Sequence, residues 1–273
     1  MQDMPLLIFT LCMQGAIGAM LWAVIMRLKD SKAPLYKRNT LVALVLSGIG
    51  IVASLLHLGQ PLLALTSLLN LSTSWLSREI LFSGGFFGLL LVYWWLERGE
   101  KAAGARSALS YLTVLVGLGA IYTMGRLYME GIMPAWQSSY TMISFYATAI
   151  ILGGIIFYLT SSVKEEPALP IDLILLAVAM IQAAFMPGYM ANLASSATMA
   201  GQESMTLMAG SEMVLGLSWL CLLGGLLLFT LTQRSKLAKQ SSILYLAVAV
   251  IFLGEIASRY IFYASGIPIG FGL

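Results

Sequence analysis

The sequence predicts an all-α protein: a polytopic membrane bundle of eight transmembrane helices, forming a single transmembrane domain over residues 1–273. Three observations support this prediction. The protein is 59% hydrophobic and only 10% charged, whereas soluble domains have roughly 25% charged residues. Its apolar stretches are about 20 residues long, which is enough to cross a hydrocarbon core of about 30 Å. Finally, lysine and arginine are concentrated in alternate gaps between these stretches.

Each apolar stretch is expected to form a helix, because backbone groups in lipid must be hydrogen-bonded within their own segment. The first stretch follows an acidic start at Asp3 and precedes no small-residue cleavage site, so we expect a retained helix and not a signal peptide. The second has His57 in its last turn and stops soon after it, since Gly59 can adopt a left-handed cap and Pro61 prevents continuation. The predicted spans are 5–27, 40–58, 78–97, 107–129, 140–161, 170–190, 212–232 and 242–264.

Three smaller features concern the packing and the connections. Gly84 and Gly88 have the small-xxx-small spacing that allows transmembrane helices to approach closely, so we expect a close contact there. Pro187-Gly188, near the end of the sixth stretch, is the one predicted break in a helix. Residues 195–210 form the longest connection on the lysine-free side, where we expect a short surface helix.

The distribution of basic residues predicts the orientation of the protein. Twelve of the fifteen Lys and Arg residues lie in the gaps after the first, third, fifth and seventh stretches, and the other gaps contain no lysine. By the positive-inside rule, the lysine-rich gaps face the cytoplasm. Both termini and the lysine-free gaps are therefore predicted to lie on the outer, periplasmic side.

Ionisable residues gather at the predicted outer ends of the stretches. Such groups at the edge of hydrocarbon are costly unless they are paired or solvated, so the cluster predicts a functional site. Glu255 and Arg259 are four residues apart and can pair on one helix face. Structural explanations also exist, because arginines can reach headgroups and acids are stabilised in the first helical turn, where we expect Glu79 and Glu212. The cluster comprises His57, Arg78, Glu79, Arg126, Glu130, Glu212, Glu255 and Arg259.

The protein has one histidine, which limits the cofactors that it can hold. A single His57 excludes a haem with two histidine ligands. A haem with histidine and methionine ligands is formally allowed by the 16 methionines, but nothing in the sequence positions one. Cys12 and Cys221 are isolated, and ligands for zinc or an iron–sulfur cluster are lacking. We therefore expect neither haem nor metal in this protein.

The segment between residues 57 and 81 carries a resemblance to a known family. It contains His-Leu-Gly-Gln-Pro from His57 and Ser-Trp-Leu-Ser-Arg-Glu-Ile-Leu from Ser74. These motifs, with the opening Pro-Leu-Leu-Ile-Phe-Thr from Pro5, resemble the DmsC-type membrane-anchor subunit of dimethyl sulfoxide reductase. The eight spans and the outward termini are similar too, so the resemblance covers essentially the whole sequence.

The resemblance implies a multi-pass protein of the bacterial inner membrane that holds a molybdopterin catalytic subunit and an iron–sulfur subunit at the periplasmic face. It also implies that the protein oxidises menaquinol there without haem. In the family, the histidine and the glutamate of these motifs are tied to quinol binding, and here they are His57 and Glu79.

From placement alone, we extend the predicted quinol site to four further residues. His57 and Glu79 are expected to accept the quinol protons, and Arg78 to hold the electron-accepting partner or to stabilise developing negative charge. The four added residues are Arg78, Arg126, Glu255 and Arg259.

Three alternatives stay open. The anchor can serve a related sulfur-compound, selenate or other oxyanion reductase, because the substrate pocket lies in another polypeptide. A purely structural anchor would dock its partners through Trp75, Trp136 and Trp219 near the outer interface. A secondary transporter would carry charged or broken helices near the bilayer midplane, whereas the ionisable groups here lie at one surface. Nucleic acid is not expected as a partner, because the basic residues lie in short loops beside the membrane.

Overall fold

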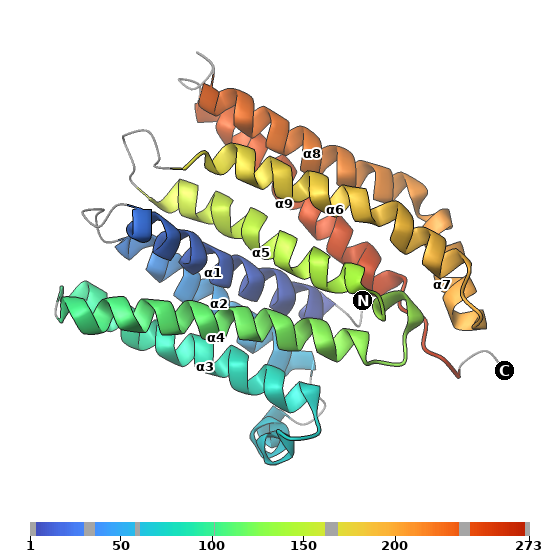
Figure 1. Ribbon diagram of the computed structural model, residues 1–273, viewed down its shortest axis with the longest axis horizontal. Helices are drawn as coiled ribbons and strands as arrows, with labels where there is room; N and C mark the ends of the chain where they lie inside the picture. Colours follow the sequence, from blue (N-terminus) through green and yellow to red (C-terminus); the bar gives the residue numbers. More distant parts are fainter. Residues whose placement is uncertain are drawn as a thin grey trace. The chain divides into compact units, whose positions relative to one another are not determined.

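The computed structural model describes residues 4–29, 36–57, 61–100, 102–161, 169–234 and 241–270. Every element in these ranges is helical (Figure 1). The long helices are α1 (Met4–Lys29), α2 (Lys37–His57), α3 (Trp75–Arg98), α4 (Ala103–Met129), α5 (Ser139–Thr160), α6 (Ile171–Ala194), α8 (Glu212–Arg234) and α9 (Ser241–Ala264). The short ones are η1 (Pro61–Asn70), η2 (Pro134–Trp136) and α7 (Met199–Gly210).

The predicted all-helical fold with eight long apolar helices is confirmed for the described residues. Among the described residues, eight helices are long and apolar enough to cross a membrane, and each coincides with one predicted stretch to within a few residues. The short helix expected in 195–210 is also confirmed as α7, whose cap is Thr198, with its hydroxyl oxygen accepting from the Gly201 amide at 3.1 Å. This is therefore a multi-pass membrane protein, and the side on which its termini lie stays a prediction.

The protein folds into two compact units. Unit 1 comprises Met1–Leu127 and Thr148–Leu169, and unit 2 comprises Tyr128–Ala147 and Pro170–Leu273. In unit 1, α1 packs along α2, and α2 also contacts α3 and η1. In unit 2, α9 packs along α8, and α6 contacts α8 and α7 (Figure 1).

In unit 1, α1 and α5 approach each other closely at two glycines. A methyl group added at Gly18 would overlap the Ala149 carbonyl, and one added at Gly153 would overlap the Gly18 backbone. The close contact predicted at Gly84 and Gly88 is wrong, because nothing lies within 4 Å of an added Cβ at either position. Both glycines lie on the exposed face of α3, opposite its buried residues, so their spacing brings no helix to them.

The break predicted at Pro187-Gly188 is also wrong, since α6 continues through Pro187 to Ala194. Proline removes only one backbone donor, and helices in membranes tolerate it where neighbouring groups compensate. The last turns of α6 are held by Tyr189, which is buried and donates its hydroxyl hydrogen to the Ala135 carbonyl at 2.9 Å. Tertiary contact therefore extends the helix beyond the proline.

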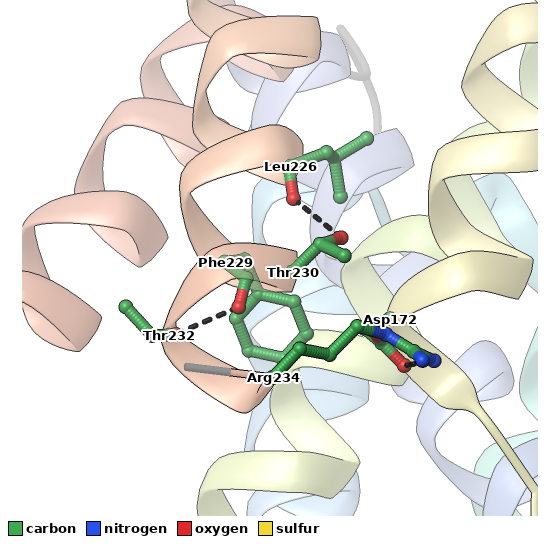
Figure 2. Close-up of polar contacts among 6 residues, drawn as sticks. All are labelled: Asp172, Leu226, Phe229, Thr230, Thr232 and Arg234. Atoms are coloured by element: carbon green, nitrogen blue, oxygen red, sulfur yellow. Dashed lines mark hydrogen bonds and ion pairs between the residues drawn. The ribbon is translucent and has the colours of Figure 1, made fainter. Parts of the chain in front are cut away.

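Each unit has two ends. We call an end lysine-rich or lysine-free according to whether the sequence gaps between the helices at that end contain lysine. At the lysine-rich end of unit 2, Arg234 at the end of α8 donates to both carboxylate oxygens of Asp172, at 2.7 and 3.3 Å (Figure 2). Asp172 lies in the first turn of α6, where the helix dipole favours an acid. The neighbouring hydroxyl groups of Thr230 and Thr232 donate to backbone carbonyls of their own helix (Figure 2).

The lysine-rich end of unit 1 carries an exposed ion pair. Lys37 donates to Glu100 at 2.6 Å, and the side chains are 44% and 67% exposed, respectively. Hydrogen bonding from the Lys37 ammonium lowers the pKa of the Glu100 carboxyl below its ordinary value. This pair links the start of α2 to the residues that follow α3.

Candidate functional site

The turn between η1 and α3 forms the lysine-free end of unit 1. Ser74 caps α3 by accepting a hydrogen bond from the Ser77 amide at 3.3 Å. The Ser77 hydroxyl, in turn, donates to the Ser67 carbonyl of η1 at 2.5 Å. Ser77 is completely buried, so this bond ties η1 to the first turn of α3 in a place that water does not reach.

Arg78 also holds this turn. Its Nε donates to the Leu71 carbonyl at 2.9 Å, and its Nη2 donates to the Ser72 carbonyl at 2.7 Å. The guanidinium carbon lies 4.2 Å from the centroid of the Trp75 ring. Arg126 at the end of α4 faces the same ring, with its guanidinium carbon 5.2 Å from the centroid. Trp75 therefore joins two cations by cation–π contacts and brings the start of α3 to the end of α4.

Glu79 is the buried acid of this end, with 5% of its surface exposed. The expectation that it lies in the first helical turn is wrong, because α3 begins at Trp75 and its first turn contains no acid. For Glu212 the same expectation is confirmed, and that residue is exposed. The helix dipole therefore does not account for Glu79, which lies on the buried face of α3 together with Ser83 and Phe86.

His57 is the last residue of α2. Because α2 packs against both α3 and η1, the end of α2 and the start of α3 lie at the same end of unit 1. His57 is predicted to accept a quinol proton, and its side chain lies outside the described part of the structure. Of the predicted quinol-site residues, unit 1 thus contains His57, Arg78, Glu79 and Arg126.

The other two predicted site residues belong to unit 2. Glu255 and Arg259 are one turn apart on α9 and are 2% and 3% exposed, respectively. The Arg259 guanidinium carbon lies 4.2 Å from the Phe145 ring centroid and 5.6 Å from that of Phe262. It is also near enough to Glu255 and Tyr140 to interact with them electrostatically. Glu130, by contrast, is exposed.

An aromatic cluster surrounds these buried charges. Trp136 stacks on Phe262 with ring centroids 5.3 Å apart, and its indole nitrogen donates to the Phe262 carbonyl at 2.7 Å. The hydroxyl groups of Tyr128 and Tyr263 are hydrogen-bonded to each other at 2.7 Å. Trp136 is only 9% exposed, so the expectation that it offers a docking surface is wrong: its ring is used inside unit 2.

Sequence reasoning missed three polar residues of unit 2. Tyr140 and Tyr189 stack with ring centroids 4.8 Å apart, and the Gln182 amide lies close enough to Tyr140 to hydrogen-bond it. Gln182 is 2% exposed. The only signal in the sequence was Gln182, a polar residue inside the apolar sixth stretch, because an amide in a membrane helix needs a hydrogen-bond partner.

A second missed cluster lies at the lysine-rich end of unit 1. Arg27 donates to the Tyr93 hydroxyl at 3.0 Å, and that hydroxyl donates to Glu97 at 3.0 Å. Glu97 is 1% exposed and Arg106 is 8% exposed. Arg106 falls just before the predicted span 107–129, whereas in the structure it lies near the start of α4 and is buried. No three His, Cys, Asp or Glu residues gather as metal ligands in the described part of the protein.

Comparison with known proteins shows what this protein is related to. Residues 1–265 match the family model described as DMSO reductase anchor subunit (DmsC). The sequence is 34% identical to the C subunit of anaerobic dimethyl sulfoxide reductase from Haemophilus influenzae over 157 residues, 56% of each protein. It is 31% identical to the C subunit of the Escherichia coli K12 enzyme, covering 59% of this protein and 58% of that one. It is also 31% identical to the YnfH subunit of an anaerobic dimethyl sulfoxide reductase from the same organism, over 56% of each protein.

The sequence thus aligns with a little over half the length of these relatives. The family model, however, matches almost all of it. This protein belongs to the DmsC family of DMSO reductase anchor subunits.

Proposed function

We propose that this protein is the membrane anchor of a respiratory reductase of the DMSO reductase type, and that it oxidises menaquinol at the lysine-free end of unit 1. The burial of Glu79, which is 5% exposed beside the Arg78–Trp75–Arg126 cluster, carries the proposal. A buried acid at the end of a membrane helix is costly, and a proton-accepting role explains its presence.

Quinol oxidation releases two protons and two electrons, and each quinol hydroxyl needs a proton acceptor. Glu79 accepts one proton and His57, at the end of α2 in the same unit, accepts the other. The electrons leave for an iron–sulfur cluster of a partner subunit, and quinone is the product. The proposal assigns no haem and no metal to this protein.

The two arginines have different functions in this proposal. The two hydrogen bonds described for Arg78 go to backbone carbonyls, so it shapes the turn that precedes α3, the helix that carries Glu79. Arg126 is anchored by the same Trp75 ring and keeps a second positive charge near this turn.

The partners follow from the family and from the predicted orientation. The relatives are named as parts of anaerobic dimethyl sulfoxide reductases, enzymes of several subunits. We propose that a molybdopterin catalytic subunit and an iron–sulfur subunit bind to the periplasmic side of the bacterial inner membrane. Protons released there are consumed on the same side by the reduction, so the cycle moves no net charge across the membrane.

Glu79→Gln in the assembled complex tests this proposal. The substitution keeps the size of the side chain and removes the proton acceptor, so quinol oxidation should fall by about 100-fold or more. Reduction of dimethyl sulfoxide with a soluble dye as the electron donor bypasses the anchor and should stay unchanged. Glu212→Gln is the matched control, because Glu212 is exposed in the first turn of α8. Wild-type quinol turnover in Glu79→Gln would remove Glu79 from the mechanism.

A further inference from the structure

Unit 2 contains a small cavity that the proposed function does not use. It lies at the lysine-free end of this unit, lined by the start of α5, the end of α6, α7, the start of α8 and the end of α9. Its volume is about 30 Å³. One water molecule needs roughly 10–15 Å³ of such space, so the cavity has room for about two waters and excludes an aromatic ring.

Hydroxyl groups line this cavity from three helices. Ser144 belongs to α5, Tyr189 to α6 and Ser258 to α9. Tyr189 and Thr141, which also lines the cavity, donate their hydroxyl hydrogens to backbone carbonyls, at 2.9 and 2.8 Å, respectively. A hydroxyl oxygen that donates in this way can still accept a hydrogen bond from water. The lining therefore offers the polar partners that a bound water requires, whereas cavities that stay empty are lined by apolar groups.

The cavity lies beside the buried charges of α9. Ser258 follows Glu255 by three residues and precedes Arg259 directly. Residues three apart on a helix are neighbours on its surface, so the Ser258 side chain lies next to that of Glu255. On α5, Tyr140 lines the cavity and interacts electrostatically with both Glu255 and Arg259. The cavity and the two charges are thus adjacent on both of these helices.

The buried charges need more than each other. Glu255 and Arg259 are only 2% and 3% exposed. Attraction between two buried ions offsets the loss of their hydration only where additional hydrogen bonds satisfy them. The rings of Phe145 and Phe262 face the guanidinium of Arg259, but an aromatic hydrocarbon ring offers no hydrogen-bond donor to a carboxylate. Water in the neighbouring cavity can supply such donors.

We infer that this cavity binds about two ordered water molecules, held by the hydroxyl groups of α5 and α9. These waters solvate the charges of Glu255 and Arg259 from the lysine-free end of unit 2. They allow an ion pair to stay charged inside an apolar helix bundle. This water site belongs to unit 2, whereas the proposed oxidation of quinol takes place in unit 1, so each statement can fail without the other.

X-ray radiolysis of the assembled complex tests whether water occupies the cavity. Radicals formed from a bound water oxidise the side chains next to it, and methionine is readily oxidised. Met208 lines the cavity and is 3% exposed, whereas Met26 of α1 is 4% exposed and does not line it. Mass spectrometry should show that Met208 is oxidised several-fold faster than Met26. Equal rates would overturn the inference.

Ser258→Leu fills the cavity and removes one of its hydroxyl groups. It should slow the oxidation of Met208 to the rate of Met26, because the waters are displaced. Ala264→Leu is the matched control, since Ala264 is the exposed last residue of the same helix, and it should leave the wild-type rate. Wild-type oxidation of Met208 in an assembled Ser258→Leu complex would mean that bulk solvent reaches it, which also overturns the inference. Ser144→Val, with the same two outcomes, replaces Ser258→Leu if that variant fails to assemble.

Removal of the two charges tests what the waters do. In the otherwise wild-type protein, Ser258→Leu displaces water from the ion pair and should lower the unfolding temperature in detergent. In the double variant Glu255→Gln with Arg259→Met, no charges remain to be solvated. The same leucine should then lower the unfolding temperature much less, or raise it, because an apolar group fills space among uncharged neighbours. An equal shift in both backgrounds would overturn the solvating role.

Discussion

The lysine-free ends of the two units use arginine in opposite ways. In unit 1, Arg78 is half-buried and gives two hydrogen bonds to the carbonyls of a turn, so its charge organises the backbone. In unit 2, Arg259 is 3% exposed and lies against Phe145 and Phe262, with the Glu255 carboxyl one turn away. The first arginine holds a turn, and the second lies against aromatic rings one turn from a buried acid.

This difference indicates how each unit tolerates charge in a membrane. A guanidinium at the edge of the hydrocarbon can use backbone carbonyls and remain partly solvated. A fully buried guanidinium needs a nearby opposite charge and ring faces, because the desolvation of each ion costs several kcal/mol. Arginines at helix ends therefore fall into two structural classes. Substitution of each arginine tests this comparison, and a third substitution tests the exposed ion pair at the other end of unit 1.

The largest effect is expected from Arg259→Met. Loss of this charge leaves Glu255 buried without its neighbouring cation, which should destabilise the protein by about 3–5 kcal/mol. Thermal unfolding in detergent, followed by tryptophan fluorescence, measures the change. The double variant Glu255→Gln with Arg259→Met should recover part of the loss. If Arg259→Met unfolded at the wild-type temperature, the buried charges would not depend on each other.

A smaller and more local effect is expected from Arg78→Met. The two hydrogen bonds to Leu71 and Ser72 are lost, which should cost about 2 kcal/mol and loosen the turn before α3. Hydrogen exchange of residues 66–74 should accelerate, while exchange in unit 2 stays unchanged. Arg126→Met is the control, because Arg126 shares the Trp75 ring but makes neither of these bonds. Equal exchange in both variants would contradict the turn-building function of Arg78.

The smallest effect concerns pH and the exposed pair Lys37–Glu100. The pKa of Glu100 is lowered in the folded protein, so the pair contributes stability above the unfolded pKa of about 4.3. That contribution disappears as the pH falls through the lowered folded pKa. The unfolding temperatures of wild type and Glu100→Gln should therefore differ slightly at pH 7 and converge below pH 4. High salt should also remove the difference, and a difference that persists at low pH would contradict the pairing.

Much of the candidate site could be predicted because its signals are local. Ser74, Ser77 and Arg78 lie within about one turn of each other at a helix start, and Glu79 follows directly. Tyr140, Gln182 and the cavity that Tyr140 lines could not be predicted in this way. They come from different helices, and no local pattern records which faces of these helices meet.

By itself, the sequence determined the number, the length and the approximate ends of the membrane helices. This follows because backbone hydrogen bonds in lipid are made within each segment, so hydrophobicity and length suffice to identify it. Only the tertiary structure decided that Gly18 and Gly153 make the close contact and Gly84 does not. It also decided that Glu79 and Glu255 are buried while Glu130 is exposed. The rotation of a helix about its axis is set by the side chains of distant segments that pack against it, and therefore by contacts that no single stretch contains.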